Sequence, residues 1–304
     1  MIRYFKTIDN VLVEIKEIKK DCWINVVNPK SDEFELLTKE ININSEFLKV
    51  SLDEEERSHV DLDKGQKIVI VDVPLDFENN KTAYSTIPLS IIITEDYIIT
   101  VCLSKTSVIS QLINLNSYLN TNHKTQMLLK LLYRTASAYL KMLKTVGRVS
   151  DEIEKNLHKS QRNKELFQML SLEKSLVYLS TSLKANESTI EKISRGQIIK
   201  IDYEDREILD DVSIEIKQAI EMCNIYSRIL SGITSSYASI ISNNLNIVMK
   251  ILTSITILMT IPNTIFGFYG MNVNLPYPTW IFAVIIALIT VLMVAFILWI
   301  KKMF

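Results

Sequence analysis

The most constraining feature of the sequence is a long uncharged stretch near its C-terminal end. From Ile251 to Ile300 no residue is Asp, Glu, Lys, Arg or His. This stretch is long enough for two helices of the roughly 20 residues that cross a bilayer. We expect the first span at about Ile247–Phe268 and the second at Trp280–Ile300. The sequence therefore excludes a purely soluble protein and predicts a multi-pass membrane protein.

The charges that flank the two spans predict their orientation. Lys250 lies at the start of the first span, Lys301 and Lys302 follow the second, and the segment between the spans carries no charge. Positive residues favour the cytoplasmic side. The N-terminal residues lack the apolar core of a signal peptide. We therefore expect both termini in the cytoplasm, the connecting loop outside, and a location in the cell (inner or plasma) membrane.

Composition argues against several classes of function. The 34 Lys and Arg residues balance 35 Asp and Glu residues, giving a formal net charge of −1, so there is no basic excess to bind nucleic acid. The three cysteines are far apart and indicate reduced packing residues rather than disulfides or a zinc site. The three histidines are equally scattered, and no partnered nucleophile or phosphate loop is present. The sequence therefore does not predict an enzyme.

The distribution of proline and β-branched residues predicts the domain organisation. No proline occurs between Leu89 and Ile261, which favours long helices there. Short β-rich segments recur at 11–18, 22–28, 66–74, 84–94 and 96–103, with helix-like segments at 31–39 and from 105 to about 118. We expect a cytoplasmic α/β domain with a mixed sheet at residues 1–120, followed by three further parts: an antiparallel helical pair at 121–200, a stalk at 201–246 and a two-span transmembrane domain at 247–304.

The stalk carries a regular apolar repeat. From Leu209 to Ile240, apolar residues recur with alternating gaps of three and four, which is typical of a coiled-coil seam. We expect this helix to continue to about Phe268 and so to enter the bilayer without a break.

A second line of residues continues into the first span and is small or polar instead. Close helix packing explains small residues, but it does not require asparagines and threonines on one line. Polar groups at that depth must face protein or water, and one span cannot enclose water, so a pore would need several copies. Met249 and Leu252, the bulkiest residues near the line, are candidates for a hydrophobic constriction. The candidate pore-lining residues are Asn246, Met249, Leu252, Thr253, Thr256, Thr260, Asn263 and Gly267.

The residues that end the first span carry a family resemblance. Tyr269-Gly270-Met271-Asn272 stands at its outer end, and in this position the sequence resembles the CorA family of divalent-cation channels along the whole chain. The resemblance implies a funnel-shaped homopentamer whose first spans line the pore. It also implies that Gly270, Met271 and Asn272 form an outer ring that selects hydrated Mg²⁺. Family members often have an acidic residue in the outer loop, whereas residues 273–278 have none.

Acidic residues of the cytosolic part are candidates for regulation. The resemblance places Asp211 where the family has a Mg²⁺-sensing carboxylate between subunits, and it suggests Asp53 or Glu54 as the partner. A run of charges such as Asp53–Glu56 is also typical of a solvated helix face.

These features together predict a passive divalent-cation channel with both transported and regulatory Mg²⁺. Transport of Zn²⁺, Co²⁺ or Ni²⁺ by the same architecture is one alternative. The other is a membrane-tethered coiled-coil assembly protein without transport, which would gain nothing from the polar line.

Overall fold

The computed structural model describes residues 1–76, 84–114, 119–160, 163–272, 277, 279–301 and 303. The chain divides into two compact units, Met1–Gly232 and Ile233–Phe304. The boundaries that we expected near residues 120, 200 and 246 stay predictions.

Within the described residues, the first unit is built on a seven-stranded sheet in the order β2-β1-β3-β7-β6-β5-β4. The β3 and β7 strands are parallel, and the other neighbouring pairs are antiparallel. The expected mixed sheet is thus confirmed. The strands are β1 (Ile2–Ile8), β2 (Val11–Ile15), β3 (Trp23–Val27), β4 (His59–Asp63), β5 (Gln66–Asp76), β6 (Tyr84–Ile93) and β7 (Ile98–Cys102).

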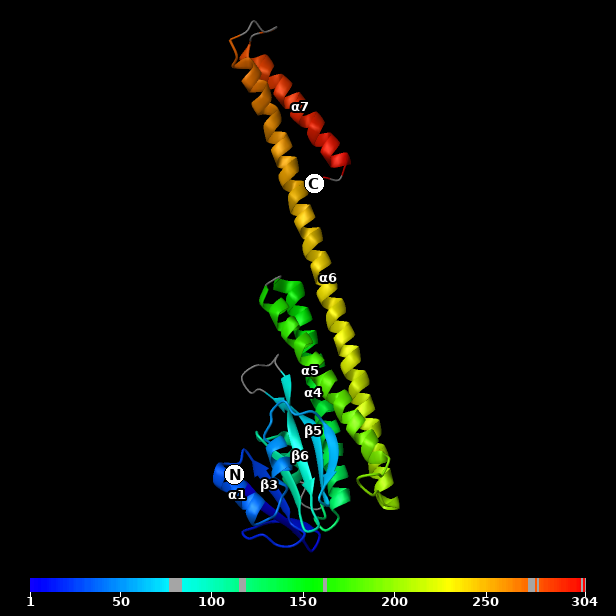
Figure 1. Ribbon diagram of the computed structural model, residues 1–304. Coiled ribbons are helices and arrows are strands. Elements are labelled where there is room, and N and C mark those ends of the chain that lie inside the picture. The colour runs from blue at the N-terminus through cyan, green and yellow to red at the C-terminus, as the bar shows by residue number, and fades with distance from the viewer. Residues whose placement is uncertain are drawn as a thin grey trace. The chain divides into compact units, whose positions relative to one another are not determined.

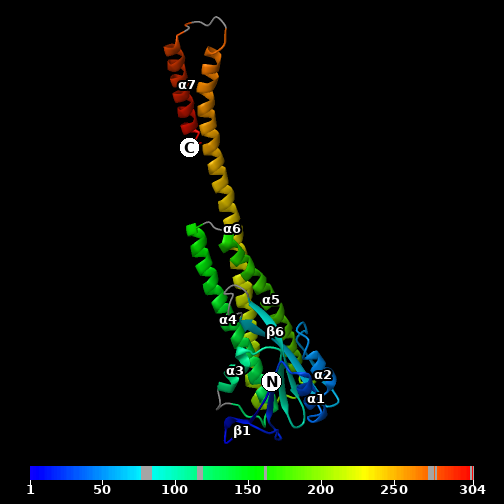
Figure 2. The ribbon, with the colours of Figure 1, turned by 90° about the vertical axis from the view of Figure 1, so that its left-hand side faces the viewer.

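Helices cover both faces of this sheet (Figure 2). On one face, α1 (Ser31–Lys39) and α2 (Ser45–Val50) contribute Leu37, Phe47 and Leu48 to a core shared with the inward side chains of the central strands. On the other face lie α3 (Ser107–Asn114), α4 (Lys124–Ser160) and α5 (Asn163–Ser194). Because both faces are covered, β3 and β7 are buried almost throughout.

The sequence did not lead us to expect the elements β1, β4 and α2. Arg3 and Lys6 interrupt the apolar pattern of β1, and β4 is an edge strand with acidic residues at positions 61 and 63. The helix α2 has six residues, which is too short to show a helical period.

The backbone of Asp72 in β5 fixes the helices to the sheet. The Asp72 N–H donates to Asn186 Oδ1 of α5 (2.9 Å), and Asn186 Nδ2 donates to the Asp72 carbonyl (2.8 Å). Tyr139 of α4 donates to the same carbonyl (3.1 Å). Polar bonds therefore fix the register of both helices on β5.

The long helix α6 (Tyr203–Tyr269) begins in this first unit (Figure 1). Between Leu209 and Leu230 its apolar repeat is buried by the chain's own helices: Cys223 Sγ donates to the Leu176 carbonyl of α5 (3.4 Å), and a Cβ on Gly147 of α4 would lie 2.5 Å from Tyr226 Oη. Burial raises the pKa of the Cys223 thiol to about 11, so it stays protonated. This part of the expected coiled-coil seam is therefore an intrachain contact.

Candidate ion pathway

The second unit contains two helices that are long and apolar enough to cross a membrane. They are α6, which ends at Tyr269, and α7 (Trp280–Ile300). The mean hydropathy of an apolar 18-residue stretch is 1.7 in α6 and 3.3 in α7. The end of α6 and both ends of α7 agree with the expected spans, and α6 continues through Pro262. The expected start of the first span at about Ile247 stays a prediction. Most of their large apolar side chains are exposed in the single chain, as expected for surfaces that lipid or other copies cover.

The α7 helix lies along α6 (Figure 1, Figure 2). The buried residues of α7 are Ala283, Ala287 and Leu298. Ala283 and Ala287 are almost fully buried, and four-residue spacing puts them on one side of α7. On α6, Ser254 is fully buried, and its hydroxyl donates to the Met303 carbonyl (3.3 Å). This contact was not expected from the sequence, although the four-residue spacing of the two alanines is a signal for it.

Most of the predicted pore-lining residues lie away from α7, whereas Thr256 and Thr260 also line an open groove beside Thr290 and Met293 of α7. All eight of them are exposed in the single chain. The α6 residues with less exposure in the same segment are Ser254, Leu258, Ile261, Pro262 and Ile265. At about 100° per residue, Thr256, Thr260 and Asn263 project roughly opposite to this covered face, whereas Thr253 projects to one side of it.

The hydrogen bonds of the threonines correct one part of the sequence argument. Thr256 Oγ1 donates to the Leu252 carbonyl (2.8 Å), and Thr260 Oγ1 donates to the Thr256 carbonyl (2.7 Å). These donors are satisfied inside the helix and need neither water nor a partner. In the described part of the chain, the amides of Asn246 and Asn263 and the hydroxyl of Thr253 make no hydrogen bond. The need for polar surroundings therefore rests on these three residues.

The motif residues close the C-terminal end of α6. The Gly270 N–H donates to the Phe266 carbonyl (2.9 Å), and the Met271 N–H donates to the Phe268 carbonyl (3.3 Å). Gly270 does not have a positive φ, but a Cβ there would lie 3.3 Å from the Phe266 oxygen. Glycine is therefore favoured by close packing within the turn. Met271 and Asn272 are exposed, while residues 273–276 and 278 of the loop between α6 and α7 lie outside the described residues.

The candidate regulatory acids are all exposed. Asp211 lies near the start of α6, and Asp53 and Glu54 follow α2. The Asp53 carboxylate accepts the Glu55 N–H (2.9 Å) and so caps a local turn. Within the described residues, no group of three or more His, Cys, Asp and Glu side chains could hold a metal ion. A metal site built from Asp211, Asp53 and Glu54 would therefore require a second copy of the chain.

Comparison with known proteins identifies the family. The sequence model described as CorA-like Mg²⁺ transporter protein matches residues 19–302. The chain belongs to the CorA family. It is 29% identical over 286 residues to the cobalt/magnesium transport protein CorA of Methanocaldococcus jannaschii, covering 90% of this chain and 88% of that protein.

Solved structures show that the CorA fold extends over the whole chain. The complete structure of the CorA magnesium transporter from Methanocaldococcus jannaschii aligns with a TM-score of 0.87 at 26% identity, covering 98% of this chain and 96% of that one. The structure of the full-length CmaX protein aligns with a TM-score of 0.76 over 100% of this chain and 97% of that one. Its 13% identity makes this a likeness of fold alone. The expected fold class, an α/β domain followed by long helices and two C-terminal spans, is confirmed.

Proposed function

We propose that five copies of this chain form a passive Mg²⁺ channel in the cell membrane. Mg²⁺ would enter the cytosol down its electrochemical gradient through a pore lined by the α6 helices. The α7 helices would form the outer, lipid-facing layer, in keeping with their higher mean hydropathy.

The exposed polar line on α6 is the observation that carries this proposal. Mg²⁺ keeps its water molecules tightly, and the hydrogens of those waters point away from the ion. A path for the hydrated ion therefore needs hydrogen-bond acceptors. Because the Thr256 and Thr260 hydroxyls donate back to the helix, their oxygen lone pairs remain available on the open side. Asn263 adds an amide oxygen on the same side.

The exposed motif at the end of α6 would form the outer entrance. A ring of Asn272 amide oxygens and Gly270 carbonyls can accept hydrogen bonds from the hydration shell without removing it. Met271 lies between these two positions and is 55% exposed, so its side chain is open to contact with another copy. Selection by the size of the hydrated ion follows from such a ring.

Gating would depend on carboxylates of neighbouring copies. Asp211 of one copy would face Asp53 or Glu54 of the next, and these groups repel one another when no cation is bound. Cytosolic Mg²⁺ bound between them would stabilise the closed arrangement. Met249 and Leu252, which are both exposed in the single chain, would close the pore by excluding water.

The proposal is tested by flux into vesicles that contain the purified protein. An internal fluorescent indicator would report the entry of Mg²⁺, Co²⁺, Zn²⁺ and Ni²⁺ added in turn. We expect Mg²⁺ entry that depends on the protein. Co²⁺ is the main competing cargo because the curated relative carries both metals in its name. Preference for Co²⁺, Zn²⁺ or Ni²⁺ would change the ion but keep the channel, whereas no flux of any cation would favour the membrane tether.

A further inference from the structure

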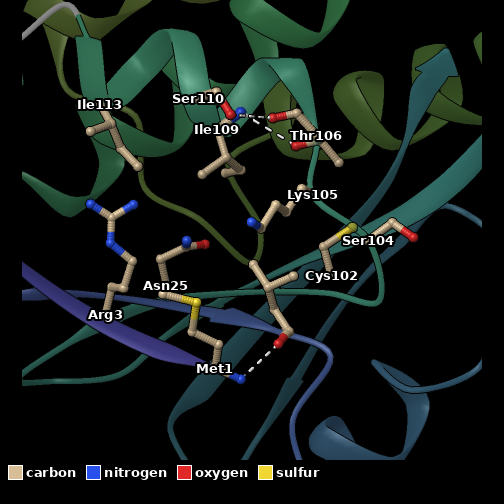
Figure 3. A pocket seen from close by; sticks show the side chains of 11 residues that line it. Met1, Arg3, Asn25, Cys102, Ser104, Lys105, Thr106, Ile109, Ser110 and Ile113 are labelled. Atoms are coloured by element: carbon tan, nitrogen blue, oxygen red, sulfur yellow. Dashed lines mark hydrogen bonds between the residues drawn. The ribbon is translucent and has the colours of Figure 1, made fainter. Parts of the chain in front are cut away.

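The cytosolic α/β domain contains a cavity that the transport proposal does not use. It has a volume of about 230 Å³ and lies between the sheet and α3 (Figure 3). Val27 and Cys102, which line it, are the last residues of the parallel strands β3 and β7. In α/β sheets, ligands commonly bind beyond the carboxyl ends of parallel strands.

A buried amide faces this cavity without a partner of its own. Asn25 of β3 lines the cavity and is 5% exposed. Its Nδ2 group makes no hydrogen bond to any residue that the structure describes. The Nδ2 atom is not sealed off from solvent, so its N–H groups are open to the cavity and available to a ligand.

A chain of hydrogen bonds determines which end of the Asn25 amide faces the cavity. The indole N–H of Trp23 can only donate, and it donates to Thr100 Oγ1 (2.9 Å). The Thr100 hydroxyl then donates its own hydrogen to Asn25 Oδ1 (3.0 Å). The oxygen of the amide is therefore occupied, and its two N–H donors remain for the cavity.

The charge at the cavity favours an anion. Lys105 makes no ion pair or hydrogen bond within the described residues, and its ammonium faces the same space as the Asn25 amide (Figure 3). Arg3 binds Glu14 through Nε and Nη2, at 2.9 and 2.8 Å, which leaves Nη1 free for another acceptor. The lining residues include no Asp or Glu, and the N-terminal end of α3, where the helix dipole is positive, is adjacent.

We propose that this cavity binds a small organic anion through its phosphate or carboxylate group. Lys105, Asn25 Nδ2 and Arg3 Nη1 would bind the anionic group, while Ile109 and Ile113 would contact a short apolar part. The volume lies below the roughly 300–1,000 Å³ of sites for drug-sized ligands, which favours a ligand of few atoms. Because the donors come from β1, β3 and the loop before α3, the ligand would connect these three segments.

The test uses the full-length purified protein in detergent. Isothermal titration with inorganic phosphate, and separately with butyrate, would be done in Mg²⁺-free buffer at constant ionic strength set with chloride. We expect saturable binding of at least one probe, and the comparison identifies whether phosphate or carboxylate is the preferred group. Absence of saturable binding by both probes would overturn the proposal.

Two variants and one matched control assign any binding to this cavity. Lys105→Gln should weaken the affinity about tenfold or more, since one charge-assisted hydrogen bond is lost. Lys49→Gln removes the same charge from an exposed position on α2 and should leave the affinity unchanged. Asn25→Asp keeps the oxygen that accepts from Thr100 but replaces the donors by a negative oxygen, and it should abolish binding.

Lys105 is exposed, so its variant remains informative even if Asn25→Asp does not fold, which thermal unfolding without ligand would reveal. Equal affinity in Lys105→Gln and the parent would reject the site. The inference is independent of the proposed transport: anion binding without cation flux would support this site and reject the channel.

Discussion

At the residue scale, single polar groups have different environments in the two units. Asn263 and Asn272 are exposed in the single chain and can act on a passing ion only if other copies surround the path. The side chain of Asp72 in β5 is instead partly buried, and burial raises its pKa. Each case leads to a separate prediction.

Asn272→Ala should reduce Mg²⁺ flux about tenfold or more, because hydrogen bonds to charged groups contribute about 1.5–3 kcal/mol each and one acceptor is lost from every copy. The residue is exposed, so folding and assembly should be unchanged, which size-exclusion chromatography would check. Vesicle flux provides the measurement. Flux equal to that of the parent would show that the motif does not select the ion.

Asp72→Asn should make the stability of the protein less dependent on pH. Burial raises the pKa of Asp72 above its ordinary value of 3.8, and a hydrogen bond with Ser182 partly opposes this. At pH values between 3.8 and the raised pKa, the native state binds more protons than the unfolded chain. The stability of the native state therefore falls as the pH rises through this range.

Above the raised pKa, the variant lacks the unfavourable buried charge. The thermal midpoint of Asp72→Asn should therefore increase relative to that of the parent as the pH rises from about 4 to about 7. Thermal unfolding of both proteins at each pH measures the difference. A constant difference across this range would mean that Asp72 does not titrate abnormally.

At the element scale, the two sides of α6 in the second unit have different neighbours. One side is covered by α7 and includes Leu258 and Ile265, while the other carries the polar line. In a channel this second side would face water, whereas in a membrane tether it would face lipid or protein.

Single cysteines introduced along α6 should distinguish these uses. Cysteines at Thr256, Thr260 and Asn263 should react with a small hydrophilic thiol reagent, whereas those at Leu258 and Ile265 should not. The three natural cysteines are buried, so background labelling should be low. Mass spectrometry measures the labelled fraction, and equal reactivity on both sides would identify the polar line as a packing surface.

At the scale of the whole molecule, neither the proposed path nor the proposed regulatory site is complete in one chain. One α6 helix supplies a single polar face, and the described residues hold no preformed cluster of metal ligands. In the proposed channel, assembly would therefore govern both ion passage and its control.

Asp211→Asn should weaken the protection from protease that millimolar Mg²⁺ gives to the assembled protein. The variant removes one carboxylate from every site between copies, while Asp210→Asn changes a neighbouring exposed charge and serves as control. Densitometry of the intact band over time gives the rates. If Mg²⁺ protects Asp211→Asn as well as the parent, Asp211 is not a sensor.

The orientation of the assembly predicts labelling from one side of the membrane. A cysteine at Asn274, in the loop between the spans, should react with an impermeant reagent added to intact cells. A cysteine at Lys301 should react only after the cells are opened. The opposite pattern would invert the topology.

The sequence by itself determined the two spans, the outer motif and the family, because each depends on local composition or on neighbouring residues. It also indicated most elements of the sheet, since β-branched runs such as those of β5 and β6 are local signals. Only the tertiary structure decided the hydrogen bonds of Asn186 with Asp72, which are 114 positions apart, and the cavity beside Asn25. Such features depend on side chains from distant segments meeting in space, and no local pattern records that meeting.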